Sequence, residues 1–154
     1  MRGNAYNLVI ALLLTLLSTQ VFANDVIGQV KTLSGKAWVE RGGSPVSATL
    51  AMSVFRQDKV VTGKKGSIGL LFNDDSRLAL GPDSTISLEN FSFNEKTHDG
   101  DFDIAIQRGT LSVISGKLTA KKPGALKVRT PVAILAVRGT EFSVKVDPPA
   151  DEAK

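Results

Sequence analysis

Three aspartates in this chain have a spacing similar to that of a metal-binding motif. Asp99, Asp101 and Asp103 repeat the Asp-x-Asp-x-Asp order that opens a calcium-binding loop. Such a loop needs glycine at its sixth position for a sharp turn and glutamate at its twelfth as a bidentate ligand. Ile104 and Thr110 occupy those two positions. We therefore expect a solvated loop that leads into a strand, and no calcium site.

The remaining combinations of reactive residues are also incomplete. Six residues separate Gly109 from Gly116 where a phosphate-binding loop requires four, and Leu118 stands where that loop needs serine or threonine. His98 is the only histidine, the chain has no cysteine, and no Gly-x-Ser-x-Gly segment marks a serine nucleophile. The sequence predicts no catalytic residue, no metal site and no cofactor, so we do not expect an enzyme.

Two side chains are candidates for binding a partner. Arg138 stands in an Arg-Gly-Thr step, where its forked guanidinium could meet a carboxylate of another protein. The interpretation we favour is structural: Gly139 permits a bulge, Thr140 bonds locally, and Arg138 pairs with an acid of its own chain. Trp38, the only tryptophan, alternates with charged neighbours, so it either stacks on a sugar or a partner or fills the core.

Positive charge is concentrated in two predicted loops. Lys64 and Lys65 lie in one, and Lys121 and Lys122 lie in the other. If folding brings the four together, they form a contact for anionic cell-wall polymer or glycan. The interpretation we favour is that they keep the protein soluble and protect exposed strand edges. The net charge of +4 is too small to predict binding of nucleic acid.

Residues 1–23 have the layout of a secretory signal peptide. Arg2 supplies a positive start, residues 8–17 are almost wholly apolar, and small residues at Val21 and Ala23 precede a cleavage site. The apolar run is about half of the roughly 20 residues that span a bilayer. We expect cleavage near Ala23 and a periplasmic or secreted mature chain without a transmembrane span. A lipid anchor is excluded because there is no cysteine.

The rest of the chain predicts short strands separated by turns. Apolar and polar residues alternate in short runs, with clusters of Gly, Asn, Asp or Pro between the runs. These runs include 59–62, 67–72, 77–80, 102–106 and 109–116. Residues 49–55 are too short for a stable helix, so we expect a loop or short strand there. Residues 128–133 and 137–144 are expected to be strands joined by a short apolar link. The prediction is an all-β fold, a single domain of many short strands over 24–147, with a disordered tail at 148–154.

Five short motifs in a fixed order resemble the FecR domain, which is found in the periplasmic parts of bacterial iron-uptake regulators. The motifs are Asp-x-Val-x-Thr-Gly, a run that ends in Asp-Gly-Ser, Gly-x-Leu, Val-x-Thr-Pro and Val-Arg-Gly-Thr-x-Phe. They stand in this chain at 58–63, 72–76, 109–111, 128–131 and 137–142. Asp75 replaces the usual glycine, a minor change because aspartate tolerates turn conformations. The structural signature of the closing segment consists of Thr130, Pro131, Gly139 and Thr140.

The resemblance implies a β-roll or β-helix-like domain over roughly residues 26–146, with a periplasmic role in protein interaction. Classical members carry a cytoplasmic anti-sigma segment and a membrane span before this domain and a small α/β signalling subdomain after it. We expect a signal peptide in place of the first two and no such subdomain, so their relay across the membrane is not carried over. The predicted function is a regulatory module that binds another envelope protein through an edge strand or the surface around Arg138. The alternative is a binder of anionic cell-wall polymer or glycan through the loop lysines and Trp38.

Overall fold

The computed structural model describes residues 25–138 and 141–147. The predicted signal peptide, the predicted tail and the signature residues Gly139 and Thr140 lie outside the described residues. Within the described part, 12 strands join in one sheet, and they are accompanied by a short helix, α2 (Lys117–Lys121). The prediction of an all-β fold of many short strands is confirmed.

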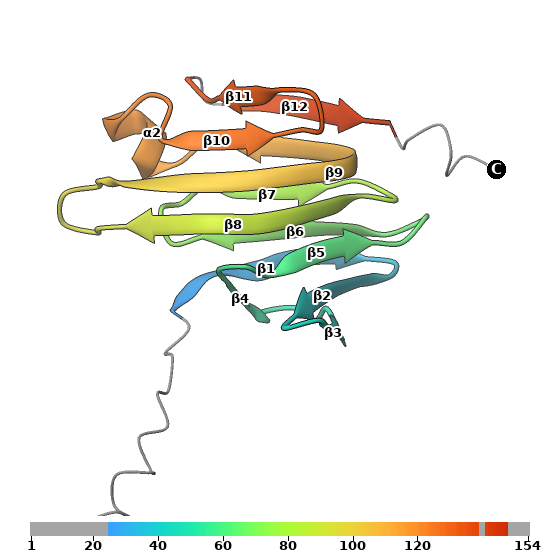
Figure 1. Cartoon of the computed structure of the whole chain (residues 1–154). Coiled ribbons are helices and arrows are strands. Elements are labelled where there is room, and N and C mark those ends of the chain that lie inside the picture. The colour runs from blue at the N-terminus through green and yellow to red at the C-terminus, as the bar shows by residue number, and fades with distance from the viewer. Residues whose placement is uncertain (1–24, 139–140, 148–154) are drawn as a thin grey trace, which may run out of the picture.

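The sheet folds over itself into two layers that face each other (Figure 1). Layer A has the order β4-β1-β6-β7-β9-β12, and layer B has the order β3-β2-β5-β8-β9-β10-β11. The strands of layer A are β1 (Val26–Ser34), β4 (Ser53–Phe55), β6 (Ser67–Phe72), β7 (Arg77–Leu80) and β12 (Glu141–Val146). Those of layer B are β2 (Ala37–Arg41), β3 (Ser44–Ser47), β5 (Lys59–Thr62), β8 (Thr85–Phe93), β10 (Leu126–Arg129) and β11 (Ile134–Ala136).

β9 (Gly100–Ile114) belongs to both layers. Its first half pairs with β8 and, in parallel, with β10, whereas its second half pairs with β7 and β12. The change of layer occurs at Gly109, whose φ of +90° lies in the region that favours glycine. A Cβ at this position would collide with the backbone of Ser84. Glycine is therefore required where the strand turns from one layer into the other.

The hydrophobic core lies between the layers and follows the period-two alternation of the strands. Successive side chains of a strand point to opposite faces, so every second residue reaches the interior. At its centre the rings of Phe72, Phe91 and Phe102 pack with centroids 4.6 to 5.9 Å apart. The described chain has no cysteine. Packing and strand pairing therefore hold this part of the chain together without disulfides.

Each end of the layered body terminates in one edge strand of each layer. At one end, residues 48–52 cross from β3 in layer B to β4 in layer A, and Ala48, the first of them, is buried. Backbone hydrogen bonds hold this crossing segment: the Val30 N–H donates to the Met52 carbonyl, and the Ala51 N–H donates to the Val30 carbonyl, both at 2.9 Å. At the other end β11 and β12 are the last strands of their layers in the described chain. Both ends of the body therefore terminate in strand edges, and the crossing segment at the first end is hydrogen-bonded to β1.

Strand predictions agree with the structure through the middle of the chain and differ near its end. The predicted runs Lys59–Thr62, Ser67–Phe72 and Arg77–Leu80 are strands with those bounds. Within 49–55 only Ser53–Phe55 is a strand, so the prediction of a loop or short strand is confirmed.

The prediction for the closing segment is wrong in its details. Strand β10 ends at Arg129, and the predicted apolar link at 134–136 is itself strand β11. The reason is the turn at 130–133, which reverses the chain early enough for Ile134 to pair with Arg129.

Candidate functional site

Three exposed apolar residues lie together at the end of layer B. Val132 is 94% exposed, Ile134 is 65% exposed and Leu135 is 38% exposed. β11 pairs with β10 on one side and with no described strand on the other. Its free edge therefore presents unpaired backbone groups beside apolar side chains. This is the arrangement that accepts an added strand from another protein.

The turn that positions β11 is built by Thr130. Its N–H donates to the Ala133 carbonyl at 2.8 Å, and its Oγ1 accepts the Ala133 N–H at 2.9 Å. Pro131 follows in an exposed bend, with Val132 beside it. These two signature residues shape the turn that brings β11 against β10.

Arg138 lies close to the same edge. It follows the buried Val137, which comes directly after β11, and it is exposed. Its guanidinium forms no hydrogen bond or ion pair with any described residue. The acid that the structural interpretation of Arg138 requires is therefore not among the described residues. The Arg138 guanidinium, with its several N–H donors, is therefore available to a partner beside the β11 edge.

Trp38 lies on the outer face of layer B, while its neighbours Ala37 and Val39 point into the core. The indole is half-buried and sits opposite Val61 on the next strand, which is buried. Its Nε1 donates to a carboxylate oxygen of Glu40 at 3.4 Å. Trp38 is therefore a surface side chain that covers part of layer B.

A shallow hollow of about 390 Å³ adjoins this indole and is also lined by Thr85, Gln107 and Arg108. The Lys59 ammonium lies 3.1 Å from the Glu40 carboxylate in the same hollow. The hydrogen bond from Lys59 lowers the pKa of Glu40 below its usual value, because it stabilises the ionised form. The hollow thus combines an aromatic face with charged and neutral polar groups.

The structure does not bring the four predicted lysines into one patch. Lys64 and Lys65 lie in the turn between β5 and β6. Lys121 and Lys122 lie at the end of α2, which contacts the turn at the opposite end of β6: the first N–H of the helix donates to the Asp74 carbonyl at 2.7 Å. Figure 1 shows α2 and the β5–β6 turn at opposite ends of the strands.

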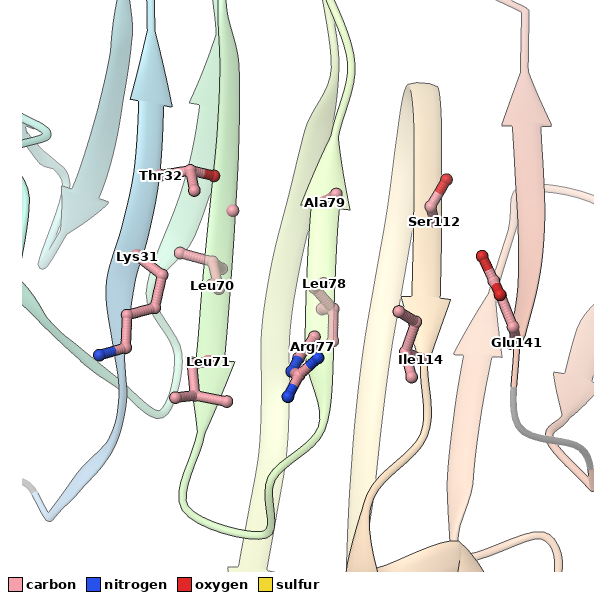
Figure 2. Close-up of a pocket in the computed structure, with 11 residues that line it drawn as sticks. Lys31, Thr32, Leu70, Leu71, Arg77, Leu78, Ala79, Ser112, Ile114 and Glu141 are labelled. Atoms are coloured by element: carbon pink, nitrogen blue, oxygen red, sulfur yellow. The ribbon is translucent and has the colours of Figure 1, made fainter.

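A groove of about 520 Å³ crosses the outer face of layer A (Figure 2). Strand register aligns a row of small residues along its floor, namely Thr32, Gly69, Ala79 and Ser112, and the row continues to Ser143. A parallel row of larger residues forms one wall: Leu71, Arg77, Ile114 and Glu141. The groove therefore offers an elongated, mostly apolar surface with a charge of each sign on its wall.

Motif residues that look reactive in the sequence are structural here. Asp58 is 1% exposed, and its carboxylate accepts hydrogen bonds from the Arg41 Nε at 2.9 Å, the Arg41 Nη2 at 2.7 Å and the Phe55 N–H at 2.9 Å. The bond to Asp58 raises the pKa of Arg41, whose guanidinium also lies 4.2 Å from the centre of the Phe55 ring. Thr62 is buried and accepts the Ser84 N–H at 2.9 Å.

Within residues 25–138 and 141–147, no three histidine, aspartate or glutamate side chains form a group that could hold a metal ion. His98 lies between β8 and β9, where its ring stacks on Phe93 with centroids 5.9 Å apart. In the same part of the chain, no helix has the length and apolar character needed to cross a membrane.

Sequence reasoning missed both the β11 edge and the groove. Residues 132–136 are all apolar, and this run was the available signal for β11, although a run so short is also typical of a link. No local pattern in the sequence predicts the groove, because its floor is formed by one small residue from each of several strands.

Comparison with known proteins gives one result about family. A protein-family model described as FecR protein matches residues 58–153, more than half of the chain. Searches among curated proteins and among solved structures gave no match. The FecR family is regulatory and non-enzymatic, and its members generally act through protein–protein signalling.

Proposed function

This chain belongs to the FecR family, and from that premise we propose that it is an exported, non-enzymatic regulatory module that binds another envelope protein through the free edge of β11. The single observation that carries the proposal is this edge, whose apolar side chains stand next to unpaired backbone groups. The predicted signal peptide supports export to the periplasm or the cell exterior. N-terminal sequencing of the protein from the envelope fraction tests export, with a start after Ala23 expected.

A comparison of the edges of layer B supports β11 over β3. The β3 edge contains Pro45 and follows two glycines, and its four residues are all exposed. Proline blocks a strand edge because it has no N–H to donate. β11 contains only Ile134, Leu135 and Ala136, without proline or charge. It therefore lacks the usual protection against an added strand.

The chemistry of the β11 edge indicates what the partner presents. A strand that adds to β11 gains main-chain hydrogen bonds and places alternate apolar side chains against Ile134 and Leu135. The exposed guanidinium of Arg138 favours an acidic residue near one end of that strand. The partner segment is thus an extended, mainly apolar stretch with a flanking carboxylate.

The test uses photo-crosslinking in living cells from a photoreactive residue at position 134, with position 46 as the matched control. Val46 is also an exposed apolar residue on a layer-B edge strand, but its strand carries Pro45. We expect one envelope protein to be captured from position 134 and not from position 46. With that protein purified, Ile134→Lys should weaken binding about tenfold or more, whereas Val46→Lys should not.

Two results would contradict this proposal. One is capture of the same proteins from positions 134 and 46, which would indicate chance encounters. The other is binding of the captured protein that Ile134→Lys leaves intact, since the contact would then lie elsewhere on the molecule.

The alternative function, binding of an anionic cell-wall polymer or glycan, has one supporting observation in the hollow beside Trp38. A half-buried indole next to charged and polar side chains is a surface on which a sugar ring can stack. Trp38 is the only tryptophan, so the fluorescence of the protein reports on the surroundings of this one indole. A fluorescence change on titration with cell-wall fragments, together with sedimentation with cell wall that Trp38→Ala abolishes, supports this function. An unchanged spectrum counts against it.

A further inference from the structure

We propose that two copies of this chain associate through antiparallel pairing of their β12 strands, which would extend layer A across both copies. This interface uses a different edge from the one assigned to the envelope partner, and it does not depend on that partner. The proposal rests on the free edge of β12 and on the order of charges along it.

β12 is the last strand of layer A in the described chain, and it pairs only with β9. Its residues alternate between exposed side chains on the outer face and half-buried ones on the inner face. The outer set is Glu141, Ser143 and Lys145, and the inner set is Phe142, Val144 and Val146. The strand therefore has a solvent face and an apolar face, as a strand within a continuous sheet has.

Among the edge strands of the described chain, β12 is the longest and carries little protection. It has six residues and no proline, whereas β4 and β11 have three residues each and β3 contains Pro45. Proteins keep unpaired edges short or place proline and charge on them. β12 has charges only near its ends, and they have opposite signs.

The order of residues in β12 is self-complementary for antiparallel pairing. A two-fold axis normal to the layer, passing next to Ser143, sets Glu141 of each copy opposite Lys145 of the other. The same register sets Phe142 opposite Val144 on the inner face and Ser143 opposite its own equivalent. Two ion pairs and two apolar pairs therefore form at once, and a shift of register loses the ion pairs.

Few interactions within one copy compete with this pairing. Lys145 bonds to Asp147 at 3.0 Å, but the two side chains are 71% and 78% exposed, and such pairs contribute little. The carboxylate of Glu141 forms no hydrogen bond or ion pair with any described residue. Both charged side chains of β12 are thus available to a second copy.

The pairing also has a consequence for the groove on layer A. The small residues of the groove floor end at Ser143 on the free edge. In the proposed register, Ser143 of one copy lies opposite Ser143 of the other, so the two rows meet end to end. The dimer would carry one continuous row of small residues across both copies.

Charge reversal tests the register by sedimentation velocity of the full chain over a wide range of concentrations. Lys145→Glu places two like-charged pairs in the interface and should weaken dimerisation about tenfold or more. Glu141→Lys should do the same. The double variant E141K/K145E restores opposite charges and should return the dimer. Lys64→Glu, in the β5–β6 turn, changes the net charge as Lys145→Glu does and should have no effect.

Cysteine cross-linking locates the axis, because the native chain has no cysteine to interfere. Ser143→Cys sets two thiols opposite each other at a spacing that a disulfide can bridge, and it should cross-link on mild oxidation. Ser112→Cys is the matched control: its hydroxyl bonds to that of Ser143 at 2.8 Å, but it lies one strand further from the edge. It should remain uncross-linked.

Three outcomes would overturn the proposal. The first is a chain that stays monomeric at all concentrations tested. The second is a dimer that survives both single charge reversals. The third is equal cross-linking of the two cysteine variants. None of these results bears on the β11 edge, so the proposed function is judged separately.

Discussion

Asp58 opens the first motif shared with the FecR family, and a search for reactive groups would select it as a candidate acid. In the folded chain it joins β5 to β2 and to the end of β4 by accepting bonds from the Arg41 guanidinium and the Phe55 N–H. Its carboxylate is buried and saturated with donors. The FecR motif at this position therefore maintains the fold.

At the residue scale, we predict that Asp58→Ala lowers the free energy of unfolding by about 2 kcal/mol, because it removes the buried carboxylate of a half-buried ion pair with Arg41 and leaves the Phe55 N–H unpaired. Urea denaturation measures the loss. Asp101→Ala is the control, since its pair with Lys122 is exposed and should change stability by about 1 kcal/mol or less. Equal effects of the two changes would show that Asp58 is not a structural anchor.

At the scale of elements, β9 decides the architecture because it is the strand that both layers share. Two expected strand runs, at 102–106 and 109–116, form one strand that ends at Ile114 and changes direction at Gly109. The turn depends on the backbone at Gly109 and on its close approach to Ser84. The same contact is held by bonds from the Ser84 hydroxyl to the Thr110 carbonyl at 3.2 Å and from the Thr110 N–H to the Ser84 Oγ at 2.9 Å.

We predict that Gly109→Ala destabilises the protein by about 3 kcal/mol, since it combines a strained φ with a collision against the Ser84 backbone. Gly42→Ala separates the two causes: its φ is also positive, at +57°, but nothing lies within 4 Å of an added Cβ. It should cost about 1 kcal/mol. Thermal unfolding of both variants provides the comparison. A similar loss of stability in the two variants would show that the collision with Ser84 contributes nothing.

At the scale of the whole molecule, stability is concentrated away from the free edges. The aromatic cluster is formed by β6, β8 and β9, and the last two of these share the longest pairing in the fold. The edge strands β3 and β11 are exposed along their length. Local opening is easiest where few apolar contacts hold the backbone.

Native-state hydrogen exchange should therefore be slowest for amides of β8 and the first half of β9, and fastest for those of β3 and β11. Slow exchange along β11 in the isolated protein would mean that its edge is already covered. The proposed function, which needs this edge to be free, would then be contradicted. Amides of β12 should gain protection as the protein concentration rises, because the proposed dimer pairs them.

The sequence predicted correctly the elements that depend on neighbouring residues, and it missed those that depend on pairing between distant segments. β5, β6 and β7 could be predicted to the residue because alternation and turn residues are local signals. The tolerance of Asp75 for a turn was also predictable, and its φ is +66°. Helix α2 was not, since its five residues are too few to show a period. β11 was taken for a link because only its pairing with β10 makes it a strand.

By itself, the sequence determined that the fold is all-β, that the motifs are those of a FecR domain and that no familiar catalytic motif is present. These properties depend on residue types and on spacings within a few positions. The tertiary structure alone decided that the two lysine pairs lie apart, that small residues from separate strands align in one groove, and that β11 and β12 become the edge strands of the two layers at one end of the body. Pairing between distant segments sets each of these features, and the register of that pairing is written in no single stretch of the chain.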